Sequence, residues 1–188
     1  MWKRMSWAVL LLVVLGAFAW ASERNIAPDA LTRATQGYNQ YEGELGWLSD
    51  GVYPDNSTEA SAFIWPNKGN LVFQFEVPYT VLGLRLRVGA DAGLYQVWAY
   101  RNAEYGEDGQ TAGANMEVLA DAVNNKFAEN TWVDLLFERA IETDYIELST
   151  SQGAEFFEVE ILGAEQTAVQ QMSWADIKTH TGLSAERR

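Results

Sequence analysis

The stretch Leu82-Gly83-Leu84-Arg85-Leu86-Arg87-Val88 decides the fold, because its apolar and polar residues alternate. A period of two is typical of a β-strand that buries one face, so the two arginines are expected to face water. The preceding stretch repeats the pattern, and the residues expected to face the core there are Leu71, Phe73, Phe75 and Val77. Two such strands in succession predict an antiparallel sheet with one buried face.

Further strands are expected on both sides of this pair. The runs are rich in Val, Ile, Phe, Tyr and Trp, and Gly, Asn, Asp and Pro separate them. They cover residues 31–35, 62–65, 94–100, 116–120, 132–137, 145–150 and 156–162. Many short strands without intervening helical periods indicate an all-β sandwich or barrel. Trp65, Trp98 and Trp132 belong to these runs or lie beside them, so we expect all three to pack in the core.

Two longer segments, residues 38–61 and 101–115, interrupt the rhythm of strands. Loops of that length in a compact domain are usually either functional or disordered. Aromatic rings can stack on the C–H face of a sugar, while guanidinium and amide groups bind its hydroxyls. The residues of this kind that we select as the candidate ligand site are Trp47, Tyr53, Arg101, Asn102 and Tyr105. The alternative for residues 101–115 is a polar hairpin without a binding role.

The first residues predict export from the cytoplasm. Lys3 and Arg4 precede the apolar run 7–15, and small residues then give A-x-A cleavage patterns that end at Ala19 and Ala21. The stretch 7–21 is shorter than the roughly 20 residues of a membrane-spanning helix, and an uncleaved anchor is the alternative. We therefore expect a secreted or periplasmic protein that has no membrane attachment once the signal is cleaved.

The domain organisation follows from the same reading. Residues 1–21 are expected to form the signal peptide, residues 25–163 one sandwich domain, and residues 164–188 a short C-terminal tail. Ser173 and Asp176 have the spacing of a helix cap, which allows a short helix that ends near Gly182. The tail either docks on the sandwich or is loosely held, and the sequence favours a loosely held tail.

The charge balance excludes two classes of partner. The chain has 13 basic and 26 acidic residues and a net charge of −13, which becomes −15 when Lys3 and Arg4 leave with the signal. Nucleic acids and anionic lipids need cationic groups to neutralise their phosphates, so neither is expected to bind. The chain has no Cys, which excludes disulfides and lipid attachment through a cysteine.

The inventory of nucleophiles and bases argues against an enzyme. The one histidine is His180 in the tail, so the sandwich cannot hold a Ser-His-Asp or Cys-His arrangement or a zinc site with several His ligands. Two carboxylates can cleave a glycosidic bond. However, the local sequence around the acidic residues does not mark any of them as a catalytic acid with a raised pKa. A small glycan hydrolase or lyase is therefore the less favoured alternative to a binding protein.

Three stretches carry a family resemblance. The first combines Leu-Ser-Asp-Gly at 48–51 with Asp-Asn-Ser-Thr at 55–58, the second is Tyr-Ile-Glu-Leu at 145–148, and the third is Phe-Glu-Val-Glu-Ile-Leu-Gly at 157–163. Together they resemble the discoidin, or coagulation-factor type C, domains and similar bacterial carbohydrate-binding modules. The resemblance covers residues 25–163 and implies an antiparallel jelly-roll β-sandwich of the galactose-binding-like kind. Asp144 and Glu147 depart from it, because the family usually has arginines there.

The resemblance also implies a structural calcium ion in the loop that begins at Asp50. In the resembling modules the first Glu of the terminal strand closes this site, and that residue is Glu158 here. Calcium binds six to eight oxygen atoms, and the loop residues that would supply carboxylate and hydroxyl oxygens are Asp50, Asp55, Ser57 and Thr58. If Phe157, Val159 and Ile161 fill the core, Glu158 points away from it. The alternative is a turn rich in Asp and Asn beside solvated carboxylates.

The sequence therefore predicts a secreted, non-catalytic binding module with a structural calcium ion. Its expected partner is a glycan or polysaccharide. The alternative is a protein-interaction or envelope-assembly module on the same sandwich. A cluster of aromatic residues at the rim would favour the glycan, and a flat apolar patch would favour a protein partner.

Overall fold

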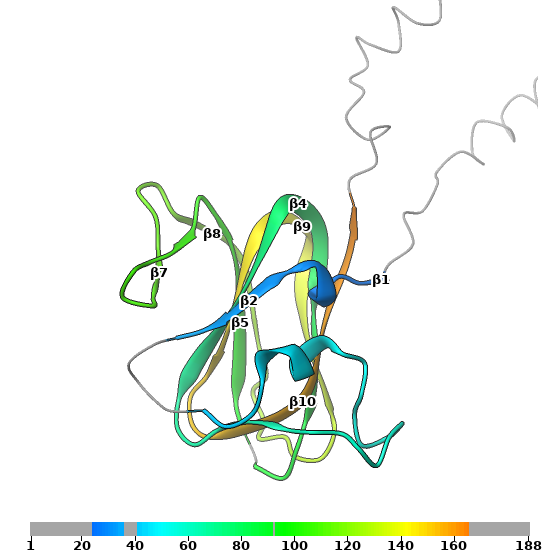
Figure 1. Ribbon diagram of the computed structural model, residues 1–188. Coiled ribbons are helices and arrows are strands. Elements are labelled where there is room, and N and C mark those ends of the chain that lie inside the picture. The colour runs from blue at the N-terminus through cyan, green and yellow to red at the C-terminus, as the bar shows by residue number, and fades with distance from the viewer. Residues whose placement is uncertain (1–23, 36–40, 92, 166–188) are drawn as a thin grey trace, which may run out of the picture.

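Two long antiparallel strands, β4 (Gly69–Val88) and β9 (Trp132–Thr150), organise the chain. They appear in Figure 1, a computed structural model that describes residues 24–35, 41–91 and 93–165. Register shifts interrupt their pairing, one of them between Gln74 and Tyr79, where both strands bend. Each strand therefore contributes one half to each of two sheets.

The main strands form one continuous eight-stranded antiparallel sheet, which the bends of β4 and β9 fold into two layers, called the first and second sheets below; β6 and β7 form a separate two-stranded sheet. The first has the order β2–β4–β9–β5–β8, and in the second β9 pairs with β4, β4 with β10, and β10 with β1 and β3. The remaining strands are β1 (Arg24–Asn25), β2 (Leu31–Ala34), β3 (Phe63–Trp65), β5 (Tyr95–Arg101), β6 (Glu104–Tyr105), β7 (Thr111–Ala112), β8 (Glu117–Val123) and β10 (Ala154–Glu165). The 3-10 helices are η1 (Ala27–Asp29) and η2 (Leu45–Ser49). This arrangement confirms the predicted all-β jelly-roll sandwich.

The structure corrects how the sequence divides into strands. The expected strands 71–77 and 82–88 are one strand, β4, and the expected strands 132–137 and 145–150 are one strand, β9. The pairing resumes beyond each bend because bulges accommodate the extra residues. At one bend Gly83 has a φ of +145°, and a Cβ there would lie 2.3 Å from the Leu135 carbonyl oxygen. Only glycine avoids both the strain and the clash.

The core lies between the two sheets. Tyr95 of β5 and Phe156 of β10 bring their ring centroids to 5.5 Å, so the inner faces are in direct contact. Phe73, Trp65 and Ile161 are fully buried in the same cluster. Burial of a large apolar side chain contributes about 1.5–3 kcal/mol, and with no Cys in the chain this packing replaces disulfides as the source of stability.

Several expectations about buried and exposed positions are wrong. Arg87 was expected to face water but is only 7% exposed. Val77 is 57% exposed, because residues 76–78 form the bend of β4 rather than a continued alternation. A register shift between Phe156 and Glu158 places Phe156 in the core and leaves Phe157 half-buried. Trp98 and Trp132 were expected in the core with Trp65, but both are only half-buried and are not among the core residues.

The two long segments make different connections. Residues 41–62 include η2 and cross from β2 of the first sheet to β3 of the second, whereas residues 101–115 link the neighbouring strands β5 and β8 of the first sheet through the β6–β7 hairpin. The hairpin lies back on the first sheet, because the Thr111 hydroxyl donates a hydrogen bond to the Glu147 carboxylate at 2.6 Å. The expected signal peptide and the helix at Ser173 lie outside the described residues. Within 24–35, 41–91 and 93–165, no helix is long and apolar enough to cross a membrane.

Candidate functional site

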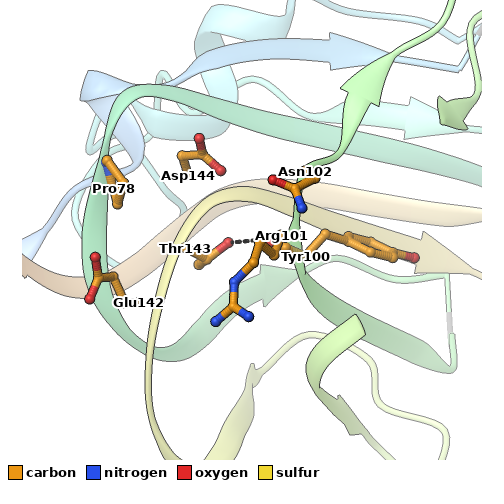
Figure 2. A pocket seen from close by; sticks show the side chains of 7 residues that line it. All are labelled: Pro78, Tyr100, Arg101, Asn102, Glu142, Thr143 and Asp144. Carbon is orange, nitrogen blue, oxygen red and sulfur yellow. Dashed lines mark hydrogen bonds between the residues drawn. The ribbon is translucent and has the colours of Figure 1, made fainter. Parts of the chain in front are cut away.

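A pocket of about 330 Å³ opens where β5 ends beside the bends of β4 and β9 (Figure 2). Arg101 and Asn102, both expected ligand-binding residues, extend from the end of β5. The full lining consists of Pro78, Tyr100, Arg101, Asn102, Glu142, Thr143 and Asp144. The structure therefore places two of the five candidate residues at one pocket, together with groups from β4 and β9.

The base of this pocket is held by Thr143. Its hydroxyl donates a hydrogen bond to the Tyr100 carbonyl at 2.7 Å and accepts one from the Tyr145 N–H at 3.1 Å. The Tyr100 and Tyr145 rings meet edge to face with centroids 6.0 Å apart. Burial and the nearby Glu147 carboxylate raise the pKa of Tyr100, which keeps its phenol neutral. These contacts fix the end of β5, and with it the backbone from which Arg101 and Asn102 project.

The polar groups at the mouth of the pocket are accessible. Arg101 Nη1 lies 3.0 Å from Glu117 Oε2, and both side chains are about 60% exposed, so this ion pair holds the guanidinium only weakly. Asn102 has a φ of +56°, and its side-chain amide donates to the Asn115 carbonyl at 3.3 Å. Glu142 is exposed and Asp144 is half-buried. Amide and guanidinium donors thus stand beside carboxylate acceptors, a combination that suits a polyhydroxylated ligand.

Tyr105 lies outside this pocket. Its hydroxyl donates to the Ala34 carbonyl at 2.5 Å, and the Arg33 guanidinium stands 5.1 Å from the ring centroid. The ring packs half-buried with Val72 and Tyr145 on the outer face of the first sheet. Tyr105 therefore anchors the β6–β7 hairpin and presents only part of its ring to a ligand.

Trp47 and Tyr53 are separated from the pocket by the body of the sandwich. Trp47 sits half-buried in η2, and its ring packs so closely on Gly43 that a Cβ there would lie 2.9 Å from a ring carbon. Tyr53 packs edge to face on Trp132 with centroids 5.1 Å apart. In Figure 1 their segment lies across the sandwich from the β6–β7 hairpin. The five candidate residues therefore do not form one cluster.

The predicted calcium loop is a tight turn built from its own polar groups. The Asp50 carboxylate accepts a hydrogen bond from the Val52 N–H at 2.8 Å, and the Asn56 side chain donates to the Gly51 carbonyl at 2.8 Å. The Ser57 hydroxyl accepts from the Glu59 N–H at 3.1 Å. Thr58 follows in the same turn and is exposed. Oxygen atoms are thus abundant here, and several already serve the turn itself.

Two of the predicted calcium ligands, Asp50 and Glu158, lie beside Gly51. Glu158 Oε2 accepts a hydrogen bond from the Gly51 N–H at 3.0 Å, although Glu158 is only 1% exposed. Burial raises the pKa of Glu158 to about 7, and repulsion from Asp50 adds to the effect. No ion pair to Glu158 occurs among the residues that the structure describes. A buried carboxylate without a counter-charge is chemically suited to a cation.

Asp55 points to a different partner. Its two carboxylate oxygens lie 2.7 and 3.1 Å from the Arg87 guanidinium, and the hydrogen bond from Arg87 lowers the pKa of Asp55. Arg87 is 7% exposed, so this pair neutralises a nearly buried cation. In the described part of the chain, no three acidic or His side chains are grouped to hold a metal. The donors that fit calcium are therefore Asp50, Glu158 and loop oxygens, without Asp55.

The sequence did not identify the other residues that line the pocket as a site. Asp144 was noted only because it departs from a family pattern, and Glu142 and Thr143 received no role. A signal did exist, because Pro78 breaks the alternation after Val77 and a proline marks the end of regular pairing. The position of this bend beside β5 depends on pairing between distant segments, which local patterns do not show.

Solved structures with a similar fold include a lectin and a carbohydrate-binding module. A fucolectin from striped bass serum matches with a TM-score of 0.55 at 16% identity, over 76% of this chain and 49% of the fucolectin. The family 32 carbohydrate-binding module of NanJ from C. perfringens, solved with galactose, gives 0.52 at 14% identity, over 75% and 99%. The C-terminal domain of a chitobiase from Bacteroides fragilis gives 0.50 at 13% identity, over 78% and 100%.

These comparisons support the fold, but the sequence identities are low. The chain spans about half the length of the fucolectin that it matches. A comparison with protein-family models gave no match, and a comparison with curated proteins also gave none. The chain therefore shares its antiparallel β-sandwich fold with these proteins at low sequence identity, and its ligand has to be argued from its own residues.

Proposed function

We propose that this protein is a non-catalytic binding module that recognises a neutral or weakly cationic glycan. The observation that carries this proposal is the pocket of about 330 Å³ at the end of β5, which Arg101 and Asn102 line together with Glu142 and Asp144 of β9. Pockets of this size hold small ligands, and a few convergent polar groups fix their orientation. The matching structures add support, since one is a fucolectin and another was solved in complex with galactose.

The charge of the pocket selects among glycans. Arg101 is paired with Glu117, whereas Glu142 and Asp144 contribute two further negative charges to the lining. The whole chain carries a net charge of −13. Polyanionic polysaccharides would therefore be repelled, while hydroxyl or ammonium groups would find acceptors. Binding through neutral hydrogen bonds should change little with salt concentration.

A glycan array followed by calorimetry tests the proposal. Asn102→Gly removes the amide and keeps the backbone at a φ that glycine adopts freely. Asp144→Asn keeps the shape of the side chain and removes its charge. Lys126→Ala is the matched control, since Lys126 is exposed and lies outside the pocket. Binding that both pocket variants weaken and the control leaves unchanged supports the proposal, and the absence of any bound glycan overturns it.

A calcium ion in the loop at Asp50 is a second part of the proposal. The carboxylates of Asp50 and Glu158 would hold it with oxygen atoms of the turn, and the ion would supply the positive charge that Glu158 lacks. Asp55 would remain with Arg87. A structural ion of this kind would stiffen the loop without taking part in ligand binding, because the pocket belongs to other elements of the fold.

Export is the third part of the proposal, and it rests on the sequence of residues 1–21 alone. A protein without Cys that works outside the cytoplasm would meet polysaccharides of the envelope or the surroundings. The second candidate function is binding to a protein, for which the edge strand β8 offers Val118 and Val123 at 53% and 48% exposure. A tight protein partner in a pull-down, with no bound glycan, would favour this alternative.

A further inference from the structure

A second pocket lies on the outer face of the first sheet, beside the turn of the β6–β7 hairpin. Its volume is about 220 Å³, and its lining comes from β2, β4, β9 and the hairpin. The lining residues that bear on binding are Thr35, Lys68, Asn70, Gln110, Ser149 and Thr150. None of them lines the pocket at the end of β5, so the two pockets are separate.

This hollow exists because the hairpin is fastened to the sheet beside it. Leu148 of β9 is buried in the core, so its neighbours Glu147 and Ser149 face outward. The hairpin is held at Glu147, which accepts the hydrogen bond from the Thr111 hydroxyl. Gln110 precedes Thr111 in the hairpin and lines the hollow together with Ser149. The same contact that anchors the hairpin therefore sets the position of one pocket wall.

The floor of the second pocket is held by hydrogen bonds within the protein. Thr35 is 5% exposed, and its N–H and its hydroxyl both donate to the Asn70 carbonyl, at 2.9 and 3.0 Å. The Asn70 side-chain amide donates to the Glu147 carboxylate. The Thr150 hydroxyl donates to the Gln152 carbonyl. A ligand that enters meets groups that are already ordered, which lowers the entropic cost of binding.

Two side chains at the walls are available to a ligand. Gln110 and Ser149 are both half-buried, yet no hydrogen bond of the Gln110 side-chain amide or the Ser149 hydroxyl occurs within the part of the chain that the structure describes. An amide offers two donors and one acceptor, and a hydroxyl both donates and accepts. The Asn70 amide adds its carbonyl oxygen at the floor. Such neutral groups, converging on one hollow, suit the hydroxyls of a sugar.

The charges around the second pocket favour a neutral ligand. Lys68 is exposed at the rim, where its ammonium group disfavours a cation. Glu147 stands behind Asn70, and its carboxylate disfavours an anion. A volume of about 220 Å³ is below the roughly 300–1,000 Å³ of sites for drug-sized ligands. The pocket therefore has the size for one sugar residue rather than for an oligosaccharide.

We propose that this second pocket binds one neutral sugar residue, with Gln110 and Ser149 as its hydrogen-bonding groups and Asn70 as an acceptor at its floor. The ligand class rests on the proposed function, whereas the position of the site does not. Thr143 lines the first pocket, and Ser149 lies six residues further along β9, a distance of about 20 Å in a strand. That separation lets both sites be occupied at once.

Amide NMR of the exported protein tests the second site, with galactose, glucose and N-acetylglucosamine each added alone at millimolar concentrations. At least one sugar should cause saturable shifts at Asn70, Gln110 and Ser149. Gln110→Ala and Ser149→Ala should each weaken its Kd there roughly fivefold, the usual effect of one lost hydrogen bond. Ser151→Ala is the matched control, since Ser151 is an exposed serine outside the lining, and should leave the Kd unchanged. The spectrum of each variant also shows whether it has folded.

The two sites can fail separately in this experiment. Shifts at Asn102 and Thr143 without any at Gln110 and Ser149 would overturn the second site and leave the proposed function in place. Shifts at Gln110 and Ser149 alone would support the second site and count against the pocket at the end of β5. If none of the three sugars shifts Gln110 and Ser149, or if both variants keep the wild-type Kd, the second site is wrong.

Discussion

Glu158→Gln tests what the buried carboxylate beside the Asp50 loop contributes to stability. The Glu158 carboxylate is 1% exposed, accepts a hydrogen bond from the Gly51 N–H, and has its pKa raised by burial from 4.5 to about 7. Glutamine keeps the size of the side chain and an oxygen acceptor for Gly51. It cannot ionise, so the variant isolates the effect of the negative charge on stability.

The raised pKa fixes the sign of the effect. Because the folded-state pKa lies above the unfolded value, the stabilisation by protonated Glu158 is complete below pH 4.5 and is lost as the pH rises through about 7. The gap between the two pKa values corresponds to at most about 3 kcal/mol. At pH 8 in a chelator, Glu158→Gln should therefore be more stable than the wild type by up to about 3 kcal/mol. Near pH 4 this difference should disappear.

Calcium should close most of the stability gap between the two proteins at pH 8. An ion that binds only the folded state adds RT ln(1 + [L]/Kd), about 2.7 kcal/mol at about a hundredfold excess over Kd. The wild type should gain this free energy and the variant should gain little, and magnesium should substitute poorly. Urea denaturation of both proteins at both pH values, with chelator and with calcium, measures all eight stabilities. If calcium stabilises both proteins equally, Glu158 is not a calcium ligand. If the variant is less stable than the wild type in chelator at pH 8, the negative charge of Glu158 does not destabilise the fold.

Three further predictions address the fold, the ion pair and the signal. Gly83→Ala should lower the free energy of unfolding by about 2–4 kcal/mol in urea denaturation. A side chain there would combine a φ of +145° with a 2.3 Å approach to the Leu135 carbonyl oxygen. An unchanged denaturation midpoint would contradict the backbone geometry described at Gly83. Asp55 has a lowered pKa, so its ion pair with Arg87 contributes above pH 3.8 and is lost as the pH falls through the lowered value. The stability gap between wild type and Asp55→Asn should accordingly close on acidification, and a gap that widens would argue against the pair. Intact-mass analysis of the exported protein should find cleavage after Ala19 or Ala21, and recovery of membrane-bound protein that retains Met1 would count against the signal.

The sandwich could be predicted from the sequence because the alternation of apolar and polar residues within each strand is a local pattern. The pattern at 82–88 and the runs around it placed every main strand of the described chain, since burial of one face requires a period of two. The bends were not accessible. Val77 continues the alternation in sequence but lies at the bend of β4, and the shift at Phe156 reverses which of two adjacent phenylalanines is buried. A bulge changes a register between strands, and no property of a single strand reveals it.

The candidate site was predictable only in part, for the same reason. Arg101 and Asn102 were selected by residue type in a long loop, and the structure places them at the pocket. Their neighbours from β9 come from about 40 residues further along the chain and became visible only through the pairing of β5 with β9. For Asp55, by contrast, the sequence predicted a role that the structure does not support. Its residue type suits calcium, but the fold supplies a nearly buried Arg87 that engages both oxygens.

Calorimetric titration of the glycan selected on an array, against wild type, Asn102→Gly, Asp144→Asn and Lys126→Ala, tests the central claim most directly. Loss of one hydrogen-bonding side chain costs about 0.5–1.5 kcal/mol, and about 1 kcal/mol corresponds to a roughly fivefold weaker Kd. The account predicts this weakening in both pocket variants, with the Lys126→Ala affinity equal to wild type. A glycan that binds all four proteins with the same Kd would contradict the assignment of the pocket, and a chain that binds no glycan would contradict the proposed function itself.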